Sequence, residues 1–171
     1  MEKYKEIMDM EIRSNACCFT GHRCLSAAHR ALLPGMLEKQ IKALIDRGVC
    51  DFITGGARGF DTLAALAVLK IRSEIPSIRL LLALPCKEQT KGWTRGEQAV
   101  YDDILKRADD VHYLSEHYTQ TCMRQRNRYM VDHSENCVFY LTAQRGGTYQ
   151  TVAYAIRQDL HLFNILLVPS E

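Results

Sequence analysis

The sequence predicts an α/β fold with a mostly parallel sheet of about six strands and helices on both faces. Short apolar runs with strand character alternate along the chain with longer runs of helical period. One apolar run, residues 78–84, is typical of a central parallel strand. Polar turns containing glycine follow three of the predicted strands. This alternation predicts right-handed crossovers and a three-layer, Rossmann-like sandwich.

Length and composition indicate a single globular domain. The chain has 171 residues, of which 47% are hydrophobic and 25% are charged. We expect residues 1–15 to form an N-terminal arm and residues 16–171 to form one domain. The net charge of +2 is too small to indicate nucleic-acid binding by itself. No apolar run reaches membrane-spanning length, so we expect no membrane partner, and the charged start of the chain has no signal-peptide core.

The cysteines and histidines predict neither a disulfide framework nor a metal site. There are seven cysteines, an odd number, and no two of them are spaced as Cys-x-x-Cys. The six histidines do not pair with cysteines at metal-ligand spacing. Buried thiols in a reducing, cytoplasmic environment are the expected result.

The first strand is predicted over residues 16–20, and Gly21, His22 and Arg23 follow at its carboxyl end. His22 and Arg23 can hold a phosphate or a carboxylate there. The alternative is that these residues form an ordinary solvated loop.

The first helix is predicted to begin near Pro34, because proline suits the first turn of a helix. Its apolar face recurs with helical spacing, and Gly48 ends it. Residues 49–54 then form the second predicted strand.

A glycine turn follows this second strand and leads into an apolar helix over residues 62–71. Strand, glycine turn and helix together present backbone N–H groups to a phosphate, and the helix start adds partial positive charge. Glycine is needed where a Cβ would block a close approach. The spacing is not that of a dinucleotide fingerprint or a P-loop. The alternative is a simple connecting turn in which Asp61 is the N-cap of the helix.

The middle of the chain supplies two further strands, over residues 78–84 and 110–115, with a helix over 97–108 between them. The polar loop at 86–96 contains Trp93, which can shield a ligand or serve as a packing anchor.

A helix over residues 121–133 carries mixed signals. Asn127 lies on the apolar stripe that contains Met123 and Met130, so it needs a partner from the protein or from a ligand. We expect the helix to direct its three arginines, at positions 124, 126 and 128, to different faces. The alternative for this cluster is a solvated basic face with an Arg128–Asp132 ion pair.

The last third of the chain predicts a strand over 136–142, a second glycine turn at 146–148, a helix to about 159, and a strand over 162–168. Three polar turns, at Gly21, Gly55 and Gly146, therefore fall at the carboxyl ends of strands. In parallel sheets ligands bind at this edge. The convergence favours a phosphate-binding site there.

Five blocks of the sequence, in order, resemble one family. They are CFTGHR at 18–23, TGGARGFD at 54–61, SEHYT at 115–119, NRYMVDHS at 127–134 and GGT at 146–148. The chain resembles the YpsA/YspA-like branch of the SLOG superfamily, the Rossmann-like group that includes the Smf/DprA and LOG proteins. The resemblance spans residues 17 to 168.

The resemblance implies a nucleotide or a nucleotide-derived ligand, similar to ADP-ribose or NAD, bound by a sensor or regulatory module. It also implies two alternatives, a nucleotide N-glycosidase like the LOG enzymes and a single-stranded DNA-binding protein like DprA. LOG hydrolases carry a glutamate after their second glycine turn, and this chain has none there, although Asp61 can still act as a catalytic acid.

We therefore expect a small-molecule partner, no cofactor beyond a nucleotide or ADP-ribose-like ligand, and no binding to single-stranded DNA. A homo-oligomer is compatible with the sequence. The residues assigned to the ligand or phosphate site are Gly21, His22, Arg23, Gly55, Gly56, Ala57, Arg58, Gly59, Asp61, Asn127, Arg128, Asp132, Gly146, Gly147 and Thr148.

Overall fold

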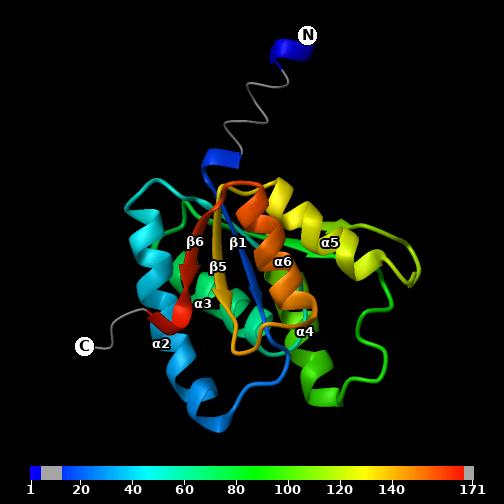
Figure 1. Cartoon of the computed structure of the whole chain (residues 1–171). Helices are drawn as coiled ribbons and strands as arrows, with labels where there is room; N and C mark the ends of the chain where they lie inside the picture. The colour runs from blue at the N-terminus through cyan, green and yellow to red at the C-terminus, as the bar shows by residue number, and fades with distance from the viewer. Residues whose placement is uncertain (5–12, 168–171) are drawn as a thin grey trace.

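The computed structural model describes residues 1–4 and 13–167 and has a six-stranded sheet at its centre (Figure 1). The strand order is β4-β3-β2-β1-β5-β6, and every pairing is parallel. The strands are β1 (Ala16–Gly21), β2 (Asp51–Thr54), β3 (Arg79–Leu84), β4 (Asp110–Tyr113), β5 (Asn136–Tyr140) and β6 (His161–Asn164). The predicted α/β fold with a mostly parallel sheet is confirmed.

Helices cover both faces of this sheet, which makes the three layers. The helices α2 (Ala27–Ile45), α3 (Phe60–Glu74) and α4 (Arg95–Arg107) form one layer. The helices α5 (Cys122–Asp132) and α6 (Gly146–Arg157) lie side by side on the other face, yellow and orange in Figure 1.

The alternation of side chains along β1 separates the two cores. Cys17 and Phe19 point into the larger core, between the sheet and α2 and α3. Ala16 and Cys18 point into the smaller core, beneath α5 and α6. This is the period of two that a strand buried on both faces requires.

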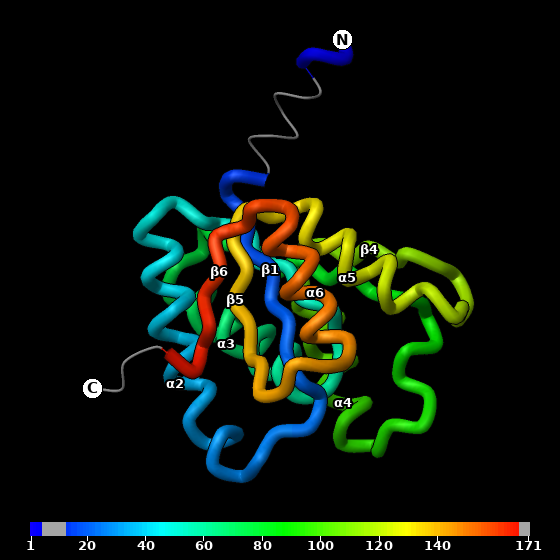
Figure 2. The backbone as a smooth tube through the Cα atoms, viewed as in Figure 1, coloured from blue at the N-terminus to red at the C-terminus, as the bar shows by residue number. Residues whose placement is uncertain are grey.

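The chain reverses its direction of travel across the sheet between β1 and β5. The first four strands are added outward from β1, and the chain then returns past them to place β5 on the other side of β1. Figure 2 shows the two strands adjacent, with the loop after β5 leading directly into α6. In open parallel sheets such a switch point leaves a crevice at the carboxyl ends of the strands.

The predicted start of the first helix is wrong. The helix α2 begins at Ala27, and Pro34 lies inside it. The Ser26 side chain is the N-cap and accepts a hydrogen bond from the His29 N–H at 3.2 Å. A side-chain cap starts the helix about two turns earlier, and the interior proline then costs one intrahelical hydrogen bond.

The last strand is shorter than predicted, because β6 ends at Asn164 and a 3-10 turn (Ile165–Leu167) follows it. Val168 and most of the predicted arm, residues 5–12, lie outside the described residues.

Within the described part of the chain, none of the helices combines the length and the apolar character needed to cross a bilayer.

The cysteines are free thiols throughout the described residues. Five of them are buried, as predicted, whereas Cys50 is half-buried and Cys24 is exposed. The described residues contain no cluster of histidine, cysteine and acidic side chains that could hold a metal ion.

Candidate functional site

A cavity of about 730 Å³ opens at the switch point between β1 and β5. The turns after β1, β2 and β5 all contribute to its wall, and α5 closes one side. The lining residues are Thr20, Gly21, His22, Arg23, Cys24, Ala57, Asp61, Arg126, Asn127, Met130, Thr142, Ala143, Arg145, Gly146, Gly147 and Thr148. The structure thus brings together residues from the three polar turns that the sequence singled out.

The turn after β1 places His22 and Arg23 in this wall. The His22 Nε2 accepts a hydrogen bond from the Thr142 N–H at 2.9 Å, which ties the end of β1 to the end of β5. Burial lowers the pKa of His22, so the ring is a neutral acceptor at pH 7. Arg23 is exposed, and among the described residues no carboxylate lies within ion-pair distance of it.

Asp61 is the buried acid of the cavity, with 5% of its surface exposed. It is not the N-cap of α3, because Gly59 holds that position without a side-chain cap. Its Oδ2 instead accepts a hydrogen bond from the Ala57 N–H at 3.3 Å. Burial raises the pKa of Asp61, and the nearby positive charge of Arg126 opposes that rise.

Arg126 is a buried residue of the cavity wall that the site assignment from the sequence left out. It is 4% exposed, and its guanidinium donates hydrogen bonds to the Gly55 carbonyl and, at 2.7 Å, to the Asn127 Oδ1. Burial lowers its pKa, whereas the Asp61 carboxylate raises it. The available signal was the spacing of Cys122, Arg126 and Met130, which share one buried stripe of α5.

The glycine turn after β2 is filled by the protein itself. A Cβ on Gly55 would lie 2.7 Å from the Arg126 Cζ, and a Cβ on Gly56 would lie 2.5 Å from a Leu84 methyl group. Gly59 has a φ of 75° and lies against the carbonyl groups of the β1 turn. Together with the hydrogen bond from Ala57 to Asp61, this leaves the turn occupied by internal contacts.

The glycine turn before α6 is open instead. Apart from its chain neighbours and the backbone of α6, no atom of the described residues lies within 4 Å of a Cβ built on Gly146 or Gly147. The N-cap residue of α6, Arg145, makes no side-chain cap, and the first turn contains no acidic residue. The first N–H groups of a helix have no intrahelical partner, so those of Gly146, Gly147 and Thr148 are available at the cavity wall.

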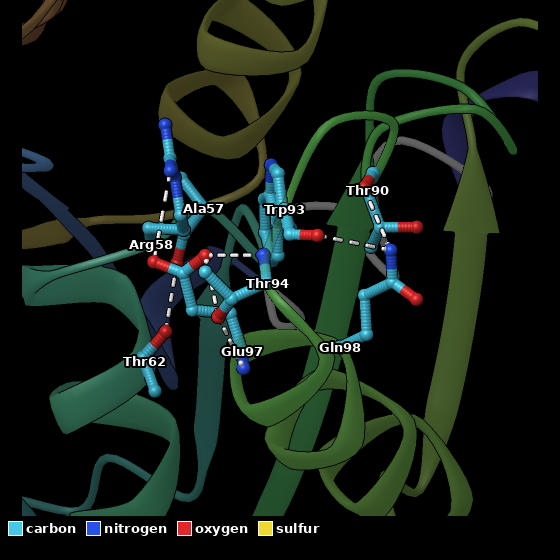
Figure 3. Close-up of polar contacts among 8 residues, drawn as sticks. All are labelled: Ala57, Arg58, Thr62, Thr90, Trp93, Thr94, Glu97 and Gln98. Atoms are coloured by element: carbon cyan, nitrogen blue, oxygen red, sulfur yellow. Dashed lines mark hydrogen bonds and ion pairs between the residues drawn. The ribbon is translucent and has the colours of Figure 1, made fainter.

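Arg58 and Trp93 lie away from the cavity lining. The Arg58 Nη1 is 3.6 Å from the Glu97 carboxylate, and its guanidinium lies 5.5 Å from the centre of the Trp93 ring (Figure 3). Trp93 also contacts Tyr101 edge-on at 5.5 Å. Of the two roles considered for Trp93, these contacts fit the packing anchor.

The remaining assigned residues on α5 divide between two places. Asn127 is half-buried and lines both this cavity and a second one of about 600 Å³ between α5 and α6, which Arg128 also lines. Asp132, near the far end of α5, accepts a hydrogen bond from the Tyr154 hydroxyl at 2.8 Å. No Arg128–Asp132 ion pair forms within the described residues.

Sequence comparison places this chain beside bacterial proteins without an assigned activity. The model of the YspA SLOG family matches residues 25–168. The chain is 33% identical to the uncharacterized SPbeta prophage-derived protein YoqJ of Bacillus subtilis over 61% of this chain and 68% of YoqJ. It is 30% identical to a UPF0398 protein of Halalkalibacterium halodurans over 77% of this chain and 71% of that protein.

Among solved structures, two DNA processing proteins A (DprA) share the fold. The protein from Streptococcus pneumoniae has a TM-score of 0.62 at 14% identity, over 90% of this chain and 50% of that chain. The protein from Helicobacter pylori, whose structure describes a single-stranded DNA binding mode, has a TM-score of 0.52 at 13% identity, over 93% of this chain and 80% of that chain. At such identities the likeness shows a common fold.

Proposed function

Because this chain belongs to the YspA SLOG family, we propose that it binds a nucleotide or a nucleotide-derived ligand, similar to ADP-ribose or NAD, as a sensor or regulatory module. The observation that carries the proposal is the cavity at the β1/β5 switch point, which is lined by an uncapped helix start and by Arg23, an arginine without an ion-pair partner among the described residues. Its volume of about 730 Å³ is within the range of small-molecule sites.

The phosphate of this ligand binds at the start of α6. The N–H groups of Gly147 and Thr148 donate to it, the helix dipole favours its charge, and Arg23 neutralises it across the cavity. The turn after β2 has a supporting role, because the Ala57 N–H already donates to Asp61. The buried Asp61 and Arg126 then shape the floor of the site.

A thermal-shift assay against a panel of nucleotides, NAD derivatives and phosphosugars tests the proposal. At least one compound should raise the melting temperature, and Arg23→Ala should reduce its affinity about tenfold or more, because a charge-assisted hydrogen bond is lost. Arg58→Ala is the matched control, since the Arg58 guanidinium contacts Trp93 and Glu97 instead. A panel without any shift, or equal losses in both variants, would overturn the proposal.

Asp61 supports a second candidate function, N-glycosidic cleavage of a nucleotide. It lines the cavity, and burial raises its pKa, the direction that a general acid requires near neutral pH. Chromatography of the same incubations separates binding from turnover. Release of free base that stops in Asp61→Asn would identify an enzyme, whereas a thermal shift without product identifies a binding module.

Single-stranded DNA binding is the third candidate. The positions of the α5 arginines in the structure favour it more than their spacing along the sequence did. Arg126 is buried, but Arg124 and Arg128 share the second cavity, where Arg157 and Tyr154 of α6 join them. A basic groove with an aromatic side chain is a feature of proteins that bind single strands. Titration of oligo(dT) at several salt concentrations tests this candidate, because such binding weakens steeply as salt rises.

A further inference from the structure

The second cavity is a groove between α5 and α6 in which positive charge is concentrated. Arg124 and Arg128 line it from α5, and Tyr154 and Arg157 line it from α6. The Arg128 and Arg157 guanidiniums lie over the same Tyr154 ring, at 5.3 Å and 5.6 Å from its centre. The aromatic ring holds the two cations in place on one wall of the groove.

These cations have no acidic partners in the part of the chain that the structure describes. No carboxylate lines the groove, and within the described residues none lies at ion-pair distance from Arg124, Arg128 or Arg157. Arg124 and Arg128 are also four positions apart on one helix, a spacing at which like charges repel. Repulsion among these positive charges therefore lowers the stability of the free protein and favours the binding of an anion in the groove.

Two other exposed arginines of this protein are paired with a carboxylate. Arg107 lies 3.0 Å from the Asp103 carboxylate, and Arg79 lies 2.7 Å from that of Asp51. Asp132, beside the groove, is hydrogen-bonded to the Tyr154 hydroxyl. Exposed Arg23 also has no carboxylate at ion-pair distance among the described residues, so unpaired arginines occur elsewhere too. The groove differs because two such guanidiniums lie over one aromatic ring.

The groove adjoins the cavity at the switch point. Asn127 and Gly147 line both spaces. A phosphate held at the start of α6 therefore has Gly147 on its path toward Arg128 and Arg157, so an adjoining phosphate on the same ligand can enter the groove.

We infer that the α5–α6 groove is a second phosphate subsite, so that the ligand carries at least two phosphates, as a nucleoside diphosphate derivative does, and not one. This inference rests on the proposed function, because it extends the same site. The first subsite uses the N–H groups at the start of α6. The second uses the guanidiniums of Arg128 and Arg157, which both lie over Tyr154.

Isothermal titration with AMP, ADP-ribose and inorganic pyrophosphate tests the inference on three proteins. They are the wild type, the double variant Arg128→Gln/Arg157→Gln, and the control Arg30→Gln/Arg95→Gln, which removes the same charge from exposed positions on α2 and α4. We expect the groove variant to bind ADP-ribose and pyrophosphate at least about tenfold more weakly and AMP less than about twofold more weakly. The control should bind all three as the wild type does.

Two kinds of failure are distinguishable in this experiment. If the wild type binds AMP as tightly as ADP-ribose, or the groove variant keeps full affinity for ADP-ribose, the second subsite is refuted and the proposed function stands. If neither nucleotides nor pyrophosphate bind, both fall. If only oligo(dT) binds, with an affinity that the groove variant loses, the groove follows a nucleic-acid strand and the inference is overturned. Circular dichroism of each variant confirms that all three are folded.

Discussion

Two turns of this protein share one local pattern, a pair of glycines between a strand and a helix, yet their surroundings differ. At Gly55 and Gly56 the space beside the backbone is filled by the Arg126 guanidinium and a Leu84 methyl group. At Gly146 and Gly147 the space that a Cβ would occupy is open, because no described residue other than the chain neighbours and the backbone of α6 comes within 4 Å of it. The first pair lets protein groups pack closely, whereas the second pair leaves backbone N–H groups free.

The difference shows that a pair of glycines indicates a close approach to the backbone, but not whether the approaching group belongs to the protein or to a ligand. In the turn after β2, the anion at the backbone is the carboxylate of Asp61, which accepts from the Ala57 N–H. In the turn before α6, no acidic residue lies in the first helical turn. The N–H group of Ala57 in the first turn is thus satisfied by the protein, whereas those at the start of α6 are left to solvent or a ligand.

The largest predicted effect comes from removing the charge that fills the first turn. Arg126→Met should lower the free energy of unfolding by about 3–5 kcal/mol, because it leaves the Asp61 carboxylate buried without its positive neighbour and removes a donor from the Gly55 carbonyl. Urea unfolding at pH 7 measures the loss. Arg124→Met, at an exposed position of the same helix, should change stability by less than about 0.5 kcal/mol. Similar losses in both variants would contradict the internal role of Arg126.

Arg126 also marks the limit of what the sequence could predict. The alternation of apolar runs was enough for the fold, and the polar strand ends were enough to locate the edge of the sheet where the cavity lies. Arg126, however, which donates a hydrogen bond to the Gly55 carbonyl, lies on α5, 71 positions away along the chain. Local spacing cannot identify such a pair, because it depends on the rotation of α5 about its axis. That rotation buries Arg126 and leaves Asn127 half-buried, whereas the apolar stripe read from the sequence contained Asn127 and not Arg126.

Gly55→Ala tests the same turn from its other side. The added Cβ would lie 2.9 Å from the Arg126 Nε and 2.7 Å from its Cζ, so Arg126 must move from its buried position. We expect a loss of about 1–3 kcal/mol in the free energy of unfolding, as for other overpacked interiors. Urea unfolding of Gly35→Ala supplies the control, because that glycine lies inside α2 with open space around it and alanine is the better helix former. A neutral Gly55→Ala would mean that the guanidinium is easily displaced.

The buried carboxyl group of Asp61 also predicts that the free energy of unfolding depends on pH. Burial raises the pKa of Asp61, so the folded protein keeps a proton that the unfolded chain releases near pH 4. The stability that this retained proton contributes is fully present below about pH 4. It is lost as the pH rises through the pKa of Asp61 in the folded protein, with a slope of at most about 1.4 kcal/mol per pH unit. Unfolding free energies of wild type and Asp61→Asn, measured from about pH 4 to about pH 8, should therefore differ by an amount that changes with pH in this direction. A constant difference would mean that Arg126 keeps the carboxylate ionised.

The smallest predicted change in stability, and one of opposite sign, lies in the second turn. Gly147→Ala should raise the free energy of unfolding by about 0.5–1 kcal/mol, because Gly147 is helical, has open space around it and gains helix propensity as alanine. Gly146→Ala should instead lose stability, because Gly146 has a φ of 87°, which alanine adopts only with strain. The same Gly147→Ala protein should bind its ligand more weakly, since the new methyl group projects where Gly147 lines both the cavity and the groove. Urea unfolding and titration of one preparation measure both quantities. A gain in stability with unchanged affinity would show that the glycines of the second turn, like those of the first, serve the fold and not a ligand.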